Sequence, residues 1–281
     1  MFRTLCMALA VTVLLAAAPV PRAQEAPAVD PFHRPYDQLL DVNVRDGLVY
    51  YRALQSERGR LDRYVASLDV PAAAYERWTP EARLAFWLNA YNALVLQTVV
   101  RHYPIRGKAP GYPAASIRQV PGAFEAARHR VAGRTLSLDD IEKTVLSEFK
   151  EPRAYLALGR GAIGSGRLRS EAYTASQLAD QLAAVQREFV QHRTMLRIDR
   201  DDDQITVTPI VSWRAQEFVA AYDKGTNGPH GARSPVERAL LTFITPHLLR
   251  LEREFVEKNQ FRVAFHEFDW RLNDLSGGRA D

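Results

Sequence analysis

The sequence predicts an α+β fold, a single domain of interspersed helices and β-hairpins around one long buried helix. Helical and strand-like patterns follow one another irregularly, without the regular strand–helix alternation of a parallel sheet. The strand-like segments are short and are mostly paired across turn residues, which is typical of hairpins. We place this domain at residues 36–275, after a flexible leader at 24–35 and before a short tail at 276–281.

The first half of the domain contains the clearest local signals. Asp46-Gly47 and Ala132-Gly133 are turn dipeptides that predict hairpins, the second one over residues 128–136. Ser137 opens a capping box, which predicts a helix that continues to about Phe149. The other expected elements are helices at 36–40, 57–68 and 81–102 and a proline- and glycine-rich surface loop at 104–122.

The second half is predicted from further capping boxes and from alternation. Thr174-Ala-Ser-Gln177 is expected to open a helix with Leu178, Leu182, Val185 and Phe189 on one face. Residues 195–208 alternate around an acidic turn and predict a hairpin. The remaining signals are a cap at Ser234 with Glu237, a helix start at Thr245-Pro246 and a strand over 261–265.

The long helix at 81–102 is unusual because it is apolar on nearly every side and yet contains two amides. Thr79 is a suitable N-cap for it, and Pro80 suits its first turn. A helix that is apolar all round is buried, so Asn89 and Asn92 are expected in the core. Burying an unpartnered amide costs about 1–3 kcal/mol. Both asparagines should therefore have hydrogen-bond partners or bind a ligand.

Residues 1–23 have the pattern of a secretory signal peptide. Arg3 precedes an apolar run at 5–18, and small residues follow up to Ala23. The run is too short to span a bilayer with ease, so we expect removal and no membrane span afterwards. Cys6 is the only cysteine, and the mature chain would have no thiol, disulfide or thiolate metal ligand. Export without disulfides predicts a periplasmic or secreted protein.

Charge is distributed less evenly than the formal net value of +4 indicates. Basic residues concentrate at 101–134 and 153–170, with few acids among them. If these segments meet in space, they form a basic face suited to an anionic glycan, a phospholipid headgroup or a carboxylate. The alternative is a solvated, arginine-rich surface. Nucleic acid is not a predicted partner, because the arginines lack interleaved aromatic residues.

Three motifs resemble known ligand sites but lack a required part. Residues 159–164 match the dinucleotide-binding glycine pattern, although no helix follows at once to receive a pyrophosphate. Asp199, Asp201 and Asp203 have calcium-loop spacing, but the positions that need glycine and a bidentate glutamate hold other residues. The seven histidines show no close pairing. We therefore predict neither a metal nor a cofactor.

Ser165 is the one candidate nucleophile that we consider. It lies in a glycine-rich loop before a predicted helix, where backbone N–H groups could stabilise an oxyanion. It lacks the Gly-x-Ser-x-Gly elbow, and no neighbouring residue is an obvious base. A hydrolase or acyl transferase using Ser165 would need Glu142 or a distant histidine such as His129.

Five motifs, taken in order, give the chain a resemblance to the bacterial domain-of-unknown-function family 547. The family's Trp-x-Asn-Ala-Tyr-Asn-Ala helix is similar to Trp87–Ala93, and its hairpin leading into Ser-Leu-Asp-Asp-Ile-Glu is similar to Gly133–Glu142. Its Asp-Pro-Arg-Ile-His-Phe-Ala-Leu segment resembles Glu151–Leu158. The later Trp and Asp-Trp motifs resemble Val211–Phe218 and Phe268–Asn273. The resemblance covers most of the mature chain.

The departures from the family pattern bear on function. Where the family shows Cys-x4-Cys-Pro, this chain has Arg160 and Ser165-Gly166, and two family histidines correspond to Lys143 and Tyr155. The family's thiols and imidazoles resemble the nucleophile and base of a cysteine-type acyl-transfer site. All of them are replaced here, and a serine depends on a base more than a thiolate does.

We therefore expect a non-catalytic binding or scaffolding domain of the bacterial envelope, with a degenerate cysteine-type site. Its partner would be an anionic small molecule or glycan, or another envelope protein. The predicted ligand-binding residues converge on the 159–167 loop and are Asn89, Tyr91, Asn92, Arg153 and Arg160. The residues of the family motifs, which we expect mainly to support the fold, are Trp87, Asp139, Glu142, Trp213, Asp269 and Trp270. The alternative is the Ser165-dependent hydrolase.

Overall fold

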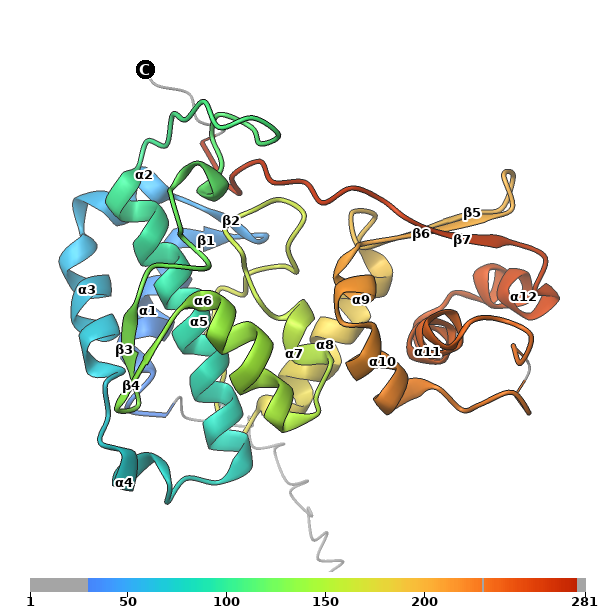
Figure 1. Cartoon of the computed structure of the whole chain (residues 1–281), viewed down its shortest axis with the longest axis horizontal. Coiled ribbons are helices and arrows are strands. Elements are labelled where there is room, and N and C mark those ends of the chain that lie inside the picture. The colour runs from blue at the N-terminus through green and yellow to red at the C-terminus, as the bar shows by residue number, and fades with distance from the viewer. Residues whose placement is uncertain (1–29, 229, 277–281) are drawn as a thin grey trace, which may run out of the picture.

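Helix α5 (Pro80–His102) runs through the centre of the larger of two lobes in this computed structural model, which describes residues 30–228 and 230–276 (Figure 1). The predicted signal peptide lies outside the described residues. Thr79 caps α5, since its Oγ1 accepts the N–H of Ala82 at 3.2 Å. Every residue of the helix from Leu84 to Val100 is buried. The prediction of a long core helix is thus confirmed, and with it the α+β fold.

The elements before α5 pack around it within the larger lobe (Figure 1). The predicted hairpin at Asp46-Gly47 is confirmed, and both turn residues have positive φ angles, 51° and 82°. The predicted helix at 57–68 is confirmed as α3, and a separate short helix, α2, precedes it. The bounds are α1 (Arg34–Asn43), β1 (Val44–Arg45), β2 (Leu48–Val49), α2 (Tyr51–Ser56), α3 (Arg58–Ser67) and α4 (Ala72–Tyr75).

After α5 the chain forms the predicted loop, which contains a 3₁₀ turn η1 (Ile117–Gln119), and then the hairpin of β3 (His129–Val131) and β4 (Arg134–Leu136). The capping box at Ser137 is present, since its Oγ accepts the N–H of Asp140 at 3.0 Å. The predicted single helix changes type along its length. It runs as α6 (Leu138–Asp140), a π turn η2 (Ile141–Val145) and a 3₁₀ turn η3 (Leu146–Phe149).

The segment that follows contains α7 (Arg153–Leu156), an irregular stretch and α8 (Leu178–Gln191). Our prediction that Thr174 caps α8 was wrong, because the helix begins with Gln177 as its N-cap. The side chain of Gln181 accepts the N–H of Thr174 at 3.1 Å and donates to the carbonyl of Ala172 at 2.9 Å. These bonds hold the residues around Thr174 outside the helix.

The smaller lobe contains a three-stranded sheet and four further helices (Figure 1). Strands β5 and β6 form the predicted hairpin, and β7 lies parallel to β6. The predicted helix at Thr245-Pro246 is only a 3₁₀ turn. The bounds are β5 (Leu196–Asp199), β6 (Gln204–Val207), α9 (Ile210–Trp213), α10 (Ala215–Tyr222), α11 (Pro235–Ile244), η4 (Thr245–His247), α12 (Arg250–Lys258) and β7 (Arg262–Phe265).

The chain after β7 returns from the smaller lobe to the larger one (Figure 1). The carbonyls of Asp269 and Arg271 accept the N–H groups of Gly164 and Ile163, at 2.9 and 2.8 Å. A Cβ at Gly164 would lie 2.7 Å from the backbone nitrogen of Asp269, so this close approach requires glycine. The returning segment therefore fixes the 159–167 loop from one side.

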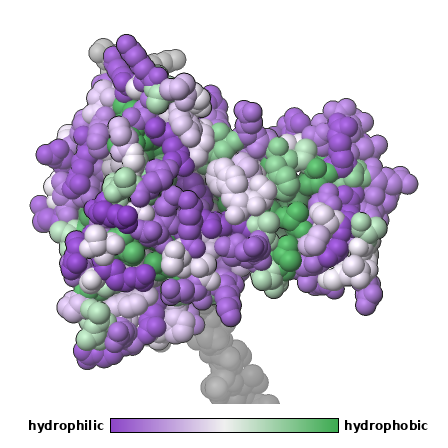
Figure 2. All heavy atoms as spheres, viewed as in Figure 1, coloured by the Kyte–Doolittle hydropathy of each residue, from purple (hydrophilic) through white to green (hydrophobic). Residues whose placement is uncertain are grey.

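Two further observations concern the surface of the smaller lobe and the possibility of a membrane-spanning helix. Figure 2 shows apolar residues at the surface of the smaller lobe, in the region where Figure 1 draws α10 and α11. Within the part of the chain that the structure describes, no helix combines the length and the apolar character needed to cross a membrane.

Candidate functional site

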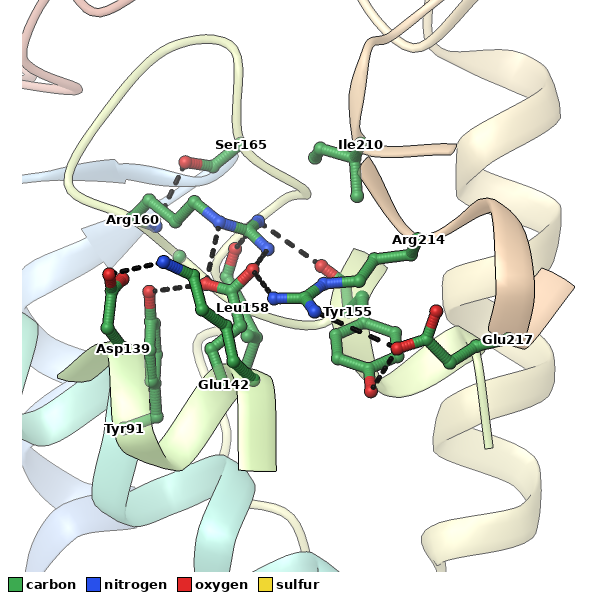
Figure 3. Close-up of polar contacts among 12 residues, drawn as sticks. Tyr91, Asp139, Glu142, Tyr155, Leu158, Arg160, Ser165, Ile210, Arg214 and Glu217 are labelled. Carbon is green, nitrogen blue, oxygen red and sulfur yellow. Dashed lines mark hydrogen bonds and ion pairs between the residues drawn. The ribbon is translucent and has the colours of Figure 1, made fainter. Parts of the chain in front are cut away.

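Glu142 lies at the centre of a buried hydrogen-bond network between the two lobes (Figure 3). It is 7% exposed and lies in the π turn after the Ser137 cap. Its carboxylate accepts hydrogen bonds from Arg160 (Nη2–Oε1, 2.8 Å; Nε–Oε2, 3.2 Å) and from Arg214 (Nη2–Oε1, 3.0 Å). The hydroxyl of Tyr91 donates to Oε2 at 3.0 Å. One carboxylate thus joins α5, the 159–167 loop and the start of α10.

Arg160 is fully occupied by these and other contacts. Its Nη1 donates to the carbonyls of Tyr155 and Leu158, at 3.2 and 3.4 Å, and the residue is 2% exposed. Buried arginine is tolerated only where it is paired and hydrogen-bonded, as here. Arg160 therefore forms the floor of the site and offers little to a ligand.

The protonation state of the network follows from its charges. Burial on its own would raise the pKa of Glu142, but the guanidinium groups of Arg160 and Arg214 outweigh it and lower this pKa to about 2. Burial and the neighbouring Glu142 raise the pKa of Tyr91 well above its usual range. At neutral pH Glu142 is ionised, and its charge is neutralised by two arginines.

A pocket of about 580 Å³ opens beside this network. Three of its charged residues, Asp139, Lys143 and Arg214, adjoin the floor, and Lys143 forms an ion pair with Asp139. Aromatic side chains also line the pocket, and we call them the aromatic wall. The lining residues are Tyr112, Arg118, Phe124, Asp139, Glu142, Lys143, Arg160, Trp213, Arg214 and Trp270.

The aromatic wall is built from segments that are distant in sequence. The ring centroids of Trp213 and Phe268 are 5.1 Å apart, and those of Phe268 and Trp270 are 4.4 Å apart. The guanidinium of Arg118 lies between Phe124 and Trp270, 4.4 and 4.5 Å from their ring centroids. Trp213 is 46% exposed, so the wall offers an accessible indole.

The two asparagines of α5 have backbone partners. Asn89 donates to the carbonyl of Tyr173 at 2.8 Å and accepts its N–H at 2.9 Å. Asn92 donates to Ala157 at 3.2 Å and accepts the N–H of Gly159 at 2.8 Å. These amides hold the two ends of the 157–173 segment against α5, and neither asparagine lines the pocket beside Glu142.

Arg153 and the basic segments also differ from expectation. The side chain of Arg153 forms two bonds to the carboxylate of Glu151, at 2.8 and 2.6 Å, and it does not line the pocket. Most arginines of the basic segments pair with carboxylates and do not gather into one basic face. The ion pairs are Arg101–Asp62, Arg118–Glu125, Arg128–Asp140, Arg130–Asp69, Arg153–Glu151, Arg160–Glu142, Arg167–Asp46 and Arg169–Glu171.

Ser165 has no base in contact. Its Oγ accepts the N–H of Arg160 at 2.9 Å, and among the described residues no histidine nitrogen or carboxylate oxygen bonds to it. The carboxylate of Glu142 is already bonded to Arg160 and Arg214. His129 lies on β3, where burial and the nearby Arg101 lower its pKa. The geometry thus gives no support to the combinations of Ser165 with Glu142 or His129.

Some of the remaining motif residues support the fold, and others line the pocket. Trp87 is fully buried and donates to the hydroxyl of Tyr75 at 2.8 Å. The side chain of Asp269 pairs with Arg271, while its backbone holds Gly164. Trp213 and Trp270, which we expected mainly to support the fold, line the pocket. Sequence reasoning missed Arg214, although it directly follows the tryptophan of a recognised motif.

Residues 75–190 match the sequence profile of the family described as "Protein of unknown function, DUF547". Searches of curated proteins and of solved structures gave no match. The predicted resemblance is confirmed over this segment. Trp213, Arg214 and Trp270 lie beyond the matched residues.

The positions at which the resemblance implied thiols and imidazoles lie together in this structure. Arg160 is bonded through its backbone to Ser165 and through its side chain to the carbonyl of Tyr155, and it lines the same pocket as Lys143. Tyr155 also lies under Arg214, with the guanidinium 4.6 Å from the ring centroid. Two charged side chains, one aromatic ring and one hydroxyl occupy these positions here.

Proposed function

We propose that this protein is a non-catalytic binding domain whose ligand is a carbohydrate, held in the pocket beside Glu142. The observation that carries the proposal is the composition of the pocket. Paired cations and carboxylates line it together with an aromatic wall that includes an exposed indole.

The pairing of the charges favours a sugar over a simple anion. Lys143 is paired with Asp139, and Arg160 and Arg214 share Glu142. A simple anion would have to compete with carboxylates already in place. Sugar hydroxyls both donate and accept, so they can bond to a cation and its carboxylate partner together. The apolar faces of a pyranose ring can pack against Trp213 and Trp270.

Two unused donors support a ligand that carries oxygen atoms. The Nε–H groups of Arg118 and Arg214 are buried and have no acceptor within the described residues. Both residues line the pocket. Buried donors are normally satisfied by protein, water or ligand. A carboxylate on the sugar could accept from one of these unused donors without displacing Asp139 or Glu142, so we favour an acidic glycan.

The absence of catalysis is part of the proposal. Glu142 is a poor base because its pKa is about 2 and two arginines compensate its charge. Arg160 occupies a position at which the family resemblance implied a thiol. A serine-directed phosphonate should accordingly leave Ser165 unlabelled, and labelling would revive the hydrolase alternative.

The test is calorimetric titration with oligogalacturonate and with a neutral oligosaccharide of equal length. We expect both to bind, the acidic one more tightly. Trp213→Ala should weaken both by about tenfold or more, since tryptophan is a frequent binding hot spot. Tyr50→Ala is the matched control, because Tyr50 is also 46% exposed but does not line the pocket. Failure of both sugars to bind would overturn the proposal.

We further propose that the mature protein acts in the periplasm or outside the cell, as its N-terminal pattern predicts. Fractionation of cells expressing the full chain should give a shortened protein in the periplasm or medium. A chain without residues 1–23 should stay in the cytoplasm. Another envelope protein remains an alternative partner, and its signature would be crosslinking that survives Trp213→Ala.

A further inference from the structure

A second cavity, of about 260 Å³, lies beside the 159–167 loop. It shares no lining residue with the pocket beside Glu142, which we call the sugar pocket. Its walls come from the β1–β2 turn, α7, the loop itself and α8. The apolar side chains that line it include Leu48, Leu156, Val185, Phe189 and Met195. A cavity of about 150 Å³ can hold benzene, so this one can hold a molecule of roughly ten heavy atoms.

Ser165 supplies a hydrogen-bond donor to this cavity. It is 7% exposed and lines the cavity, and its Oγ accepts the N–H of Arg160 at 2.9 Å. Within residues 30–228 and 230–276 its hydroxyl donates no hydrogen bond. A buried hydroxyl without an acceptor is costly, so a ligand oxygen would be stabilised here.

The charged residues at the cavity are already paired. Arg167 bonds to Asp46 at 3.0 Å and lies 3.5 Å from Glu188, which also accepts from Arg169 at 3.2 Å. A charged ligand would have to break one of these contacts or remain unpaired beside them. An uncharged ligand leaves all of them in place.

We infer that this cavity binds a small uncharged apolar molecule with one hydrogen-bond acceptor, such as a ketone or an ester. The apolar body would lie among Leu156, Val185 and Phe189, and its oxygen would accept the proton of Ser165. The binding is non-covalent and independent of the sugar pocket.

Titration of the full mature chain with 2-octanone, octanoate and octylamine tests this inference. We expect the ketone to bind and the two charged probes to bind at least tenfold more weakly. Equal binding of all three probes, or no binding of the ketone, would overturn it.

Two variants locate the site. Val185→Phe should fill the cavity and abolish ketone binding, whereas Val190→Phe, the same change on the same helix, should leave it intact. Ser165→Ala should weaken ketone binding about five- to tenfold, the effect of one hydrogen bond, and Ser147→Ala should not. If Val185→Phe still binds the ketone, or if Ser165→Ala binds as well as the parent, the assignment is wrong. A melting curve for each variant confirms that it is folded.

Discussion

Two arginines of one loop form ion pairs of nearly equal length in opposite surroundings. Arg160 pairs with Glu142 at 2.8 Å, and Arg167 pairs with Asp46 at 3.0 Å. The side chains of the first pair are 3% and 10% exposed, and those of the second are 42% and 92% exposed. Their distances are alike, so a difference in their effect on stability must come from burial and from the further hydrogen bonds that Glu142 accepts.

The two pairs should differ in how much stability the protein loses when one partner is removed. Removing one partner of a buried pair leaves an uncompensated charge in a medium that solvates it poorly. At an exposed pair, water replaces the lost partner at little cost. Glu142 also binds Arg214 from the smaller lobe, so the buried pair connects the lobes as well (Figure 3). Arg160, at the floor of the site beside Glu142, therefore has a structural role.

The largest effect is expected from Glu142→Gln, which keeps the shape of the side chain and removes its charge. Arg160 and Arg214 would lose their counter-ion, and the free energy of unfolding should fall by about 3–5 kcal/mol. Urea denaturation of the mature protein measures it. Glu125→Gln is the control, since Glu125 pairs with Arg118 and its side chain is 54% exposed. A loss below about 1 kcal/mol for Glu142→Gln would contradict the contrast between the pairs.

Acid should remove the same contribution in the parent protein. The folded pKa of Glu142 is about 2, below its ordinary value of 4.5, so folding favours the ionised form. The stability it contributes is present above pH 4.5 and is lost as pH falls towards 2, by about 3 kcal/mol. The stability difference between the parent and Glu142→Gln should shrink over this interval.

This difference isolates Glu142 from other titrating groups. Burial lowers the pKa of His33 to about 4, so His33 also destabilises the fold as pH falls from 6.5. Because both proteins contain His33, its effect cancels in the comparison. A difference that stays constant from pH 5 to pH 2 would show that Glu142 has an ordinary pKa.

Local signals were sufficient for many of the elements. Thr79 caps α5 as expected, and the turns at Asp46-Gly47 and Ala132-Gly133 adopt the positive φ angles that such dipeptides favour. What the local signals did not predict depends on a side-chain contact and on the pairing of strands. Gln181 draws Thr174 out of its predicted cap, and β7 pairs in parallel with a strand that α9 to α12 separate from it. Neither contact leaves a periodic pattern in the sequence.

The candidate site was only partly predictable for the same reason. Arg160 and Tyr91 were expected at the site and are found in its network. Arg153 was expected there too, but it finds a partner two residues away in Glu151. The aromatic wall joins Tyr112, Trp213 and Trp270, which only the folded chain brings together. Sequence identified residue types with chemistry, and the fold decided which of them meet.

The smallest effect is expected at the exposed pair. Asp46 has a φ angle of 51°, which asparagine also tolerates, so Asp46→Asn removes the charge and keeps the turn. The free energy of unfolding should change by less than about 0.5 kcal/mol. Differential scanning calorimetry at low and at moderate salt measures this change, and any small loss should diminish with salt, because exposed charges are screened. A loss close to that of Glu142→Gln would mean that the rim of the apolar cavity depends on Arg167 being paired. The exposure of Asp46 would then be a poor guide to its role.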